Sequence, residues 1–109
     1  MKFEILLKSS HLIIPAKLSN QILKDNTSVY VSYKKDLGAL LLSPKENDWF
    51  PKLHESMEFI LKSKDLAGTK SVAIREILID QDLDDGDKTL TCTMNEERRF
   101  LKVTLPTAG

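Results

Sequence analysis

Residues 12–18, Leu-Ile-Ile-Pro-Ala-Lys-Leu, recur in altered form at residues 77–83, Ile-Leu-Ile-Asp-Gln-Asp-Leu. Each copy is an apolar triplet, then a residue that favours the start of a helix, then a leucine one turn later. Each is followed by a polar turn and a strand–loop–strand passage that ends in proline, at Pro44 and Pro106. Such a repeat decides the architecture before any single element does. The sequence therefore predicts one domain, residues 1–109, built from two half-repeats, residues 1–44 and 69–106.

Short segments of alternating or continuous apolar residues predict the strands of both halves. They lie at residues 3–8, 12–14, 27–34, 39–42, 69–75, 77–79, 88–94 and 100–105. Pro15 is suited to the first turn of a short helix that follows the second strand. Residues 72–83 also fit one continuous helix, because short apolar runs are compatible with both periods.

The segment between the halves predicts one amphipathic helix, at about residues 48–64. Asp48 would cap it, and Pro51 would lie in its first turn. Its apolar face would pack against the sheet, since an aromatic stripe at helical spacing is more often core than a binding surface. That face consists of Trp49, Phe50, Leu53, Met57, Ile60 and Leu61.

Composition argues for a globular protein of the cytoplasm. The apolar content of 41% and charged content of 29% are ordinary for a folded domain. No apolar run approaches the ~18–20 residues of a membrane span, and the first residues lack a signal-peptide cleavage site. A single cysteine, Cys92, permits no disulfide within the chain, which suits a reducing compartment. A chain this short buries a limited core, so we expect a homo-oligomer.

Catalytic and metal-binding patterns are weak in this sequence, so we predict no enzyme, no metal site and no cofactor. A nucleophilic pair would need Cys92 with His11 or His54, yet Cys92 alternates with apolar residues and reads as a buried small side chain. The acidic run at residues 80–87 lacks the glycine and the glutamate positions of a calcium-binding loop. It reads instead as a helix cap and a solvated turn.

The order of these elements resembles the MraZ family, which is built from swapped-hairpin modules of the AbrB and SpoVT type. The resemblance is carried by Ile-Pro-Ala-Lys at residues 14–17, the strand and proline at 40–44, the Asp-Trp pair at 48–49, Leu-Ala-Gly at 66–68 and the acidic turn at 83–88. It implies a mostly β α+β fold, in which two swapped-hairpin half-modules form one barrel-like unit joined by the amphipathic helix. It also implies ring-like assembly and the binding of double-stranded DNA by a transcriptional regulator.

The chain departs from the Asp-x-x-x-Arg motifs of that family. Lys8 and His11 occupy the first motif, and Arg75 occupies the acidic position of the second. A module of the same fold that binds protein partners and has lost DNA binding is therefore the alternative function. Net charge is zero overall, but residues 1–44 carry six lysines and three acids, or +3. The predicted phosphate contacts are Lys8, His11, Lys17, Lys34, Lys35, Arg75, Arg98 and Arg99.

Overall fold

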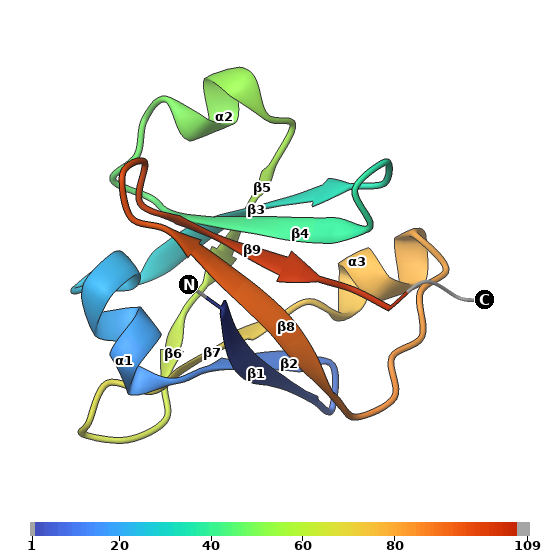
Figure 1. Ribbon diagram of the computed structural model, residues 1–109, viewed down its shortest axis with the longest axis horizontal. Helices are drawn as coiled ribbons and strands as arrows, with labels where there is room; N and C mark the ends of the chain where they lie inside the picture. Colours follow the sequence, from blue (N-terminus) through green and yellow to red (C-terminus); the bar gives the residue numbers. More distant parts are fainter. Residues whose placement is uncertain (1, 107–109) are drawn as a thin grey trace.

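The computed structural model describes residues 2–106, which fold mostly into β-strands with three short α-helices and one π-helical turn (Figure 1). In chain order these elements are β1 (Lys2–Lys8), β2 (His11–Ile14), α1 (Ala16–Leu18), η1 (Ser19–Leu23), β3 (Ser28–Lys34), β4 (Ala39–Pro44), α2 (Phe50–Leu53), β5 (Met57–Ile60), β6 (Lys62–Ser63), β7 (Lys70–Ala73), α3 (Arg75–Asp80), β8 (Lys88–Asn95) and β9 (Phe100–Thr104).

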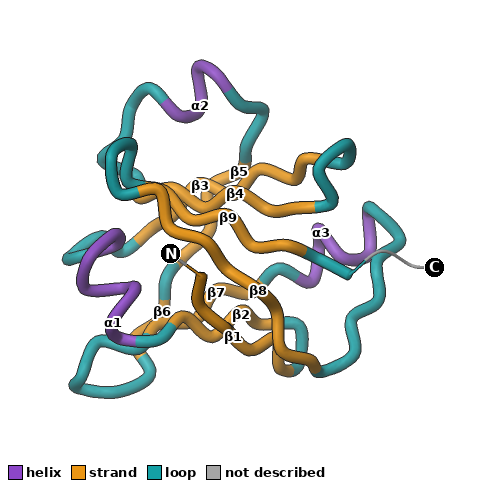
Figure 2. Tube along the Cα trace, in the orientation of Figure 1, coloured by secondary structure: helices purple, strands orange, loops and turns teal. Residues whose placement is uncertain are grey.

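The strands form one antiparallel sheet that nearly closes into a barrel. Their order is β5-β3-β4-β9-β8-β1-β2-β7-β6. The two end strands, β5 and β6, are consecutive in the chain and are separated only by Leu61. The Leu61 amide donates to the Thr27 carbonyl at 2.9 Å, next to the β3–β5 ladder. One continuous stretch of chain, residues 57–63, therefore pairs with β3 at one end of the sheet and with β7 at the other. Figure 2 shows the helices at the periphery of these strands.

Strand alternation places the core inside the sheet. In β1, Ile5 and Leu7 are buried, whereas Glu4, Leu6 and Lys8 are exposed. The same period of two buries alternate residues of β8, because successive side chains of a strand point to opposite faces. Twenty-two buried residues form one apolar cluster, to which both predicted halves contribute. The prediction of a mostly β, barrel-like fold is confirmed.

A second, smaller aromatic cluster covers the outer face of β4. All six residues of β4 are buried. Phe50 of α2 is fully buried; it stacks on Tyr30 of β3 and contacts Phe100 of β9, so α2 bridges the strands on either side of β4. His54 packs on Phe50 with ring centroids 4.7 Å apart. Burial, together with the charge of Lys34, lowers the pKa of His54 and favours its neutral ring.

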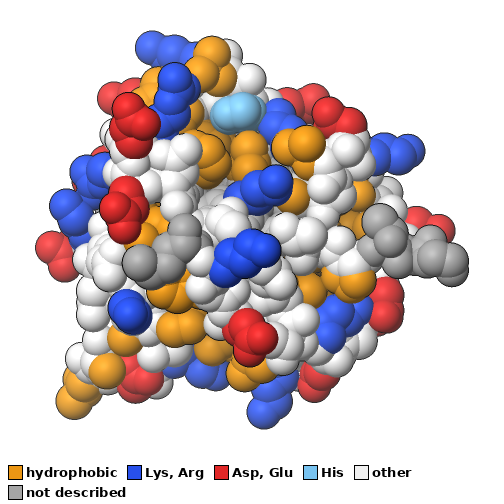
Figure 3. All heavy atoms as spheres, viewed as in Figure 1, with side chains coloured by type: hydrophobic (Ala, Val, Ile, Leu, Met, Phe, Trp, Pro, Cys, Tyr) orange, Lys and Arg blue, Asp and Glu red, His pale blue; other side chains and the backbone are white. Residues whose placement is uncertain are grey.

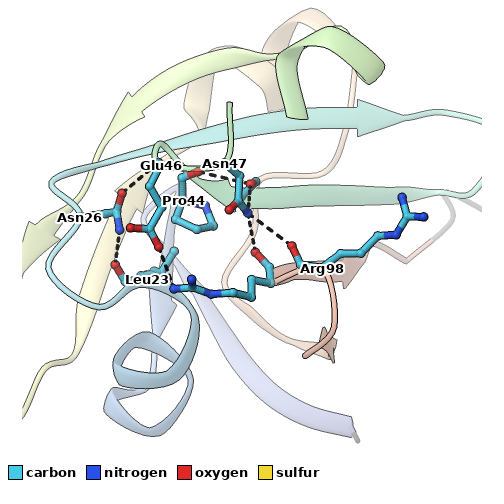
Figure 4. A network of polar contacts seen from close by, with 8 residues as sticks. Leu23, Asn26, Pro44, Glu46, Asn47 and Arg98 are labelled. Carbon is cyan, nitrogen blue, oxygen red and sulfur yellow. Dashed lines mark hydrogen bonds and ion pairs between the residues drawn. The ribbon is translucent and has the colours of Figure 1, made fainter. Parts of the chain in front are cut away.

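Asn47 holds the loop before α2 against the β8–β9 turn (Figure 4). Its side-chain amide donates to the Ser43 hydroxyl at 2.9 Å and to the Arg99 carbonyl at 2.9 Å, with a longer contact of 3.4 Å to the Arg98 carbonyl. The neighbouring Glu46 forms an ion pair with Arg99, with 2.7 Å between the carboxylate oxygen and the guanidinium nitrogen. Two loops far apart in the sequence are thereby joined through one largely buried amide.

The predicted helix at residues 48–64 is wrong beyond its first turn. α2 ends at Leu53, and His54 is already extended, with φ −129° and ψ 130°. The chain then forms β5 and β6 instead. Met57 and Ile60 of the predicted inward face are 51% and 71% exposed. The reason is non-local: the edge of β3 needs backbone partners, and residues 57–60 supply them.

The predicted strand at residues 77–79 is also wrong, because these residues lie in α3. The competing helix at 72–83 is wrong at its start, since Val72 belongs to β7 and pairs with Leu12. The two quoted copies therefore occupy different elements. Residues 12–18 run from strand into helix, whereas residues 77–83 run from helix into turn.

We predict that Asn47→Ala lowers the free energy of unfolding by about 2 kcal/mol, because it leaves the buried Ser43 hydroxyl and the Arg99 carbonyl without their donor. Urea denaturation measures the change. Asn20→Ala is the matched control, since its exposed amide makes one bond, to the Ala67 carbonyl at 3.1 Å. Equal losses for the two variants would contradict the role given to Asn47.

Candidate nucleic-acid interface

The eight predicted phosphate contacts do not form one surface. β4 and β9 pair antiparallel, so the turns of the two hairpins, β3–β4 and β8–β9, lie at opposite ends of this ladder (Figure 1). The turn with Lys34 and Lys35 lies beside Leu105, whose amide donates to the Gly38 carbonyl at 2.8 Å. The turn with Arg98 and Arg99 lies instead beside Asn47. The two basic turns therefore lie at opposite ends of the sheet and do not form a single contact surface.

Four of the eight predicted contacts are also dispersed or already engaged. Arg99 pairs with Glu46, while the Arg98 side chain points away from that network (Figure 4). The Lys17 ammonium lies 5.8 Å from the centroid of the Phe3 ring, at the end of β2 away from His11. Arg75 begins α3, beyond the end of β7. Only Lys8 and His11 meet directly, as a cross-strand pair between β1 and β2.

Lys8 and His11 line a groove on the outside of β1, β2, β7 and β6, with a volume of about 380 Å³. Leu7, Leu12 and Val72 point into the core, so their neighbours along these strands point outward. Ser71 pairs with both Ile13 and Lys62, which brings β6 to the same surface. The groove is lined by Lys8, Ser9, His11, Ile13, Lys62, Ser63, Lys64 and Ser71. We call it the basic groove.

The basic groove contains three lysines and one histidine but no acidic residue in its lining. Within residues 2–106, Lys8, Lys62 and Lys64 take part in no ion pair. Glu58 and Glu76 line a neighbouring hollow that Lys62 also borders, whereas the two carboxylates of the flanking turns are engaged with backbone. Asp87 accepts the Ser9 amide at 2.9 Å, and Asp65 accepts three amides of its own turn. Hydrogen bonds from Thr69, then from the other backbone amides, lower the pKa of Asp65. The groove thus offers unpaired positive charge to an anion.

His11 has a defined orientation in this groove. Its Nδ1 lies 2.8 Å from the Ser9 carbonyl, which can only accept, so Nδ1 carries the hydrogen of this bond. In the neutral ring Nε2 is then an acceptor, and it becomes a donor only when the ring is protonated. A hydrogen bond from Nε2 to an anionic oxygen would therefore require the protonated ring.

Lys62 and Lys64 were not among the predicted contacts because both were placed near the end of the expected helix. A signal for Lys62 exists in the sequence. Residues 4–9 read Glu-Ile-Leu-Leu-Lys-Ser and residues 58–63 read Glu-Phe-Ile-Leu-Lys-Ser. The first copy ends β1 and the second spans β5 and β6. Comparison of these stretches would have matched Lys62 to Lys8 and predicted a strand in place of a helix.

The described structure gives little support for a reactive thiol or a metal site. Cys92 is fully buried, and burial raises the pKa of its thiol to about 11. Across residues 2–106, no three His, Cys, Asp or Glu side chains gather closely enough to hold a metal ion. In the acidic segment, Asp84 accepts the Gly86 amide at 3.0 Å and pairs with Lys88 at 2.8 Å, as in a solvated turn. Among the described helices, none has the length and apolar content needed to cross a membrane.

Comparison with known proteins adds no family to these observations: no protein-family model matches the chain, and no curated protein matches it.

We predict that Cys92 is inert to thiol reagents in the folded protein. Its sulfur is inaccessible, and a thiol whose pKa is about 11 is almost entirely protonated at neutral pH. Colorimetric thiol titration should detect about one group per chain in denaturant and almost none in native buffer. Rapid labelling of the native protein would show that the strand opens or that the thiol is activated.

Proposed function

We propose that this protein is a DNA-binding regulator resembling the MraZ and AbrB proteins, with the basic groove as its contact to the phosphate backbone. The observation that carries the proposal is the acid-free lining of that groove, in which Lys8, Lys62 and Lys64 are unpaired among the described residues. Lysines that neutralise phosphates release condensed counterions, which supplies sequence-independent affinity. Because net charge is zero, this affinity depends on local clustering and not on a general attraction.

Strand pairing supports two related half-modules. β4 and β9 are neighbours, β3 and β8 flank them, and the next strands outward are β5 and β1. The first half thus gives a strand to the second, because β1 pairs with β8, whereas β5 comes from the segment between the halves and pairs with β3. Such exchange is what a swapped-hairpin arrangement requires.

Burial supports an alignment of the two copies that differs from the match of residues 12–18 with residues 77–83. Residues 12–18 correspond to residues 72–78, because both segments run from a strand into a helix. The matched positions Leu12 and Val72, Ile14 and Ile74, and Leu18 and Leu78 are all at most 1% exposed. Arg75 then occupies the place of Pro15. Lys8 then matches Lys62 only across a length difference, because residues 64–69 separate β6 from β7 whereas residues 9–10 separate β1 from β2.

DNA titration tests the proposal. We expect the protein to bind fluorescently labelled duplex DNA, including the sequence upstream of its own gene, at ~50 mM salt and to lose affinity steeply at ~200 mM. The double variant Lys8→Glu, Lys62→Glu should bind at least tenfold more weakly, about 1.4 kcal/mol or more. Fluorescence anisotropy measures both effects.

Lys34→Glu with Lys35→Glu is the matched control, since it makes the same charge change in a turn remote from the groove. Absence of wild-type binding at ~50 mM salt would rule the proposal out, because phosphate contacts are strongest there. Equal loss in the control would show that only net charge matters.

The surface of β5 favours a second function, association through protein contacts. β5 pairs along one edge only within the described sheet, and its Met57 and Ile60 are 51% and 71% exposed. Leu53 and Ile79 add further exposed apolar area, at 65% and 63%. Exposed apolar side chains beside an unpaired strand edge favour pairing with another chain. This surface supports the proposal of a homo-oligomer, either as a scaffold or together with DNA binding.

We predict that Ile60→Glu reduces self-association, because it places a charge beside the open edge of β5. Light scattering coupled to size-exclusion chromatography measures the mass of wild type and variant. Leu37→Glu is the control, since Leu37 is 54% exposed in a hairpin turn. A monomeric wild type would rule out the oligomer, and an unchanged mass for Ile60→Glu would place its interface elsewhere.

A further inference from the structure

Two rows of outward side chains cross the basic groove in opposite directions. The first row follows Lys8 of β1, His11 of β2 and Ala73 of β7. The second row follows Lys62 of β6, Ser71 of β7 and Ile13 of β2. Each row therefore begins with a lysine on a strand that flanks the β2–β7 pair. It then crosses that pair and ends at an apolar residue. A half-turn about that ladder converts one row into the other.

The repeated sequence places identical residues at positions that this half-turn relates. Glu4, Leu7, Lys8 and Ser9 are matched by the identical residues Glu58, Leu61, Lys62 and Ser63. Both copies bring their lysine and serine to the same groove. The exposed positions before the lysines also match, with Leu6 49% and Ile60 71% exposed. Two copies of one sequence thus line the groove. They are related by an axis that passes between Leu12 and Val72, which pair with each other.

Each copy of the repeated stretch has one further basic group near its lysine, at a different position. Lys8 of the first copy is accompanied by His11, and Lys62 of the second copy is accompanied by Lys64. His11 corresponds to Ser71, so the half-turn relates the two lysines but not their companions. Equivalence is therefore expected of Lys8 and Lys62 alone.

We infer that the basic groove lies on a two-fold axis of duplex DNA, with Lys8 and Lys62 as equivalent contacts to phosphates of opposite strands. The inference rests on the proposed function and names how the duplex is held. The lysines are three strand spacings of about 4.8 Å apart across the sheet and two residues of about 3.4 Å apart along it, a backbone separation of roughly 16 Å. The grooves of B-DNA are about 6 and 12 Å wide, so two flexible lysines at this spacing reach phosphates on both sides of one groove. Symmetric protein surfaces bind symmetric DNA in this manner.

Single charge removals test the equivalence. Lys8→Gln and Lys62→Gln should weaken duplex binding by the same factor, within about twofold, and each should reduce the slope of log affinity against log salt by about 0.9. The double variant should reduce that slope by about 1.8. Lys52→Gln, an exposed lysine of α2 outside the groove, should leave the slope unchanged. Urea denaturation verifies that all variants fold.

A duplex with one methylphosphonate strand tests the contact to opposite strands. On this half-neutral duplex, the slope of log affinity against log salt for wild-type protein should be smaller by about 0.9, because one lysine no longer meets a charged phosphate. A protein that uses one strand only would retain its full slope by binding the charged strand, and that result would overturn the inference.

The outcomes separate the two proposals. If wild type binds the normal duplex but Lys62→Gln behaves as wild type while Lys8→Gln does not, the two-fold inference is wrong and the proposed function stands. The inference is equally wrong if neither substitution changes the slope. If wild type fails to bind any duplex, both proposals are overturned.

Discussion

Closure of the sheet by residues 57–63 is the constraint on which the rest of the structure depends. This stretch pairs with β3 before Leu61 and with β7 after it. Without it, β3 and β7 would both be open edges with unsatisfied backbone groups. The same pairing brings Lys62 and Ser63 to the outer face of β7, opposite Lys8 and His11. The barrel and the basic groove are thus two results of one segment of backbone.

Local patterns predicted the strands well and the connections poorly. The segments around Ile5, Val31 and Leu90 alternate or concentrate apolar residues, and the observed strands begin and end within about two residues of the expected bounds. Residues 57–61 fail because apolar residues three and four apart fit a helix as readily as a strand. The choice between them is made by the edge of β3, some thirty positions earlier, which no local window contains.

The candidate site was predictable only in part. Lys8 and His11 were predicted as phosphate contacts from their basic side chains, and they do lie together. The two basic turns were also among the predicted contacts, but antiparallel pairing of β4 and β9 places them at opposite ends of the sheet. Lys62 could have been found from the repeated Glu-x-x-Leu-Lys-Ser stretch, which carries both a lysine and a strand. Lys64 has no such counterpart, and only the path of the chain after β6 places it in the groove.

The pairing of β1 with β8 has a consequence for synthesis of the chain. Lys2 pairs with Thr93, and Ile5 pairs with Leu90. The first strand to be synthesised therefore cannot complete its pairing until β8, the last strand but one, has been made. Until then the nascent first half exposes the apolar edge of β1 on the ribosome. Contacts this distant in sequence make folding slow and leave intermediates prone to aggregation. Cellular yield of this protein should therefore depend on chaperones and on the rate of translation, in addition to the stability of the finished barrel.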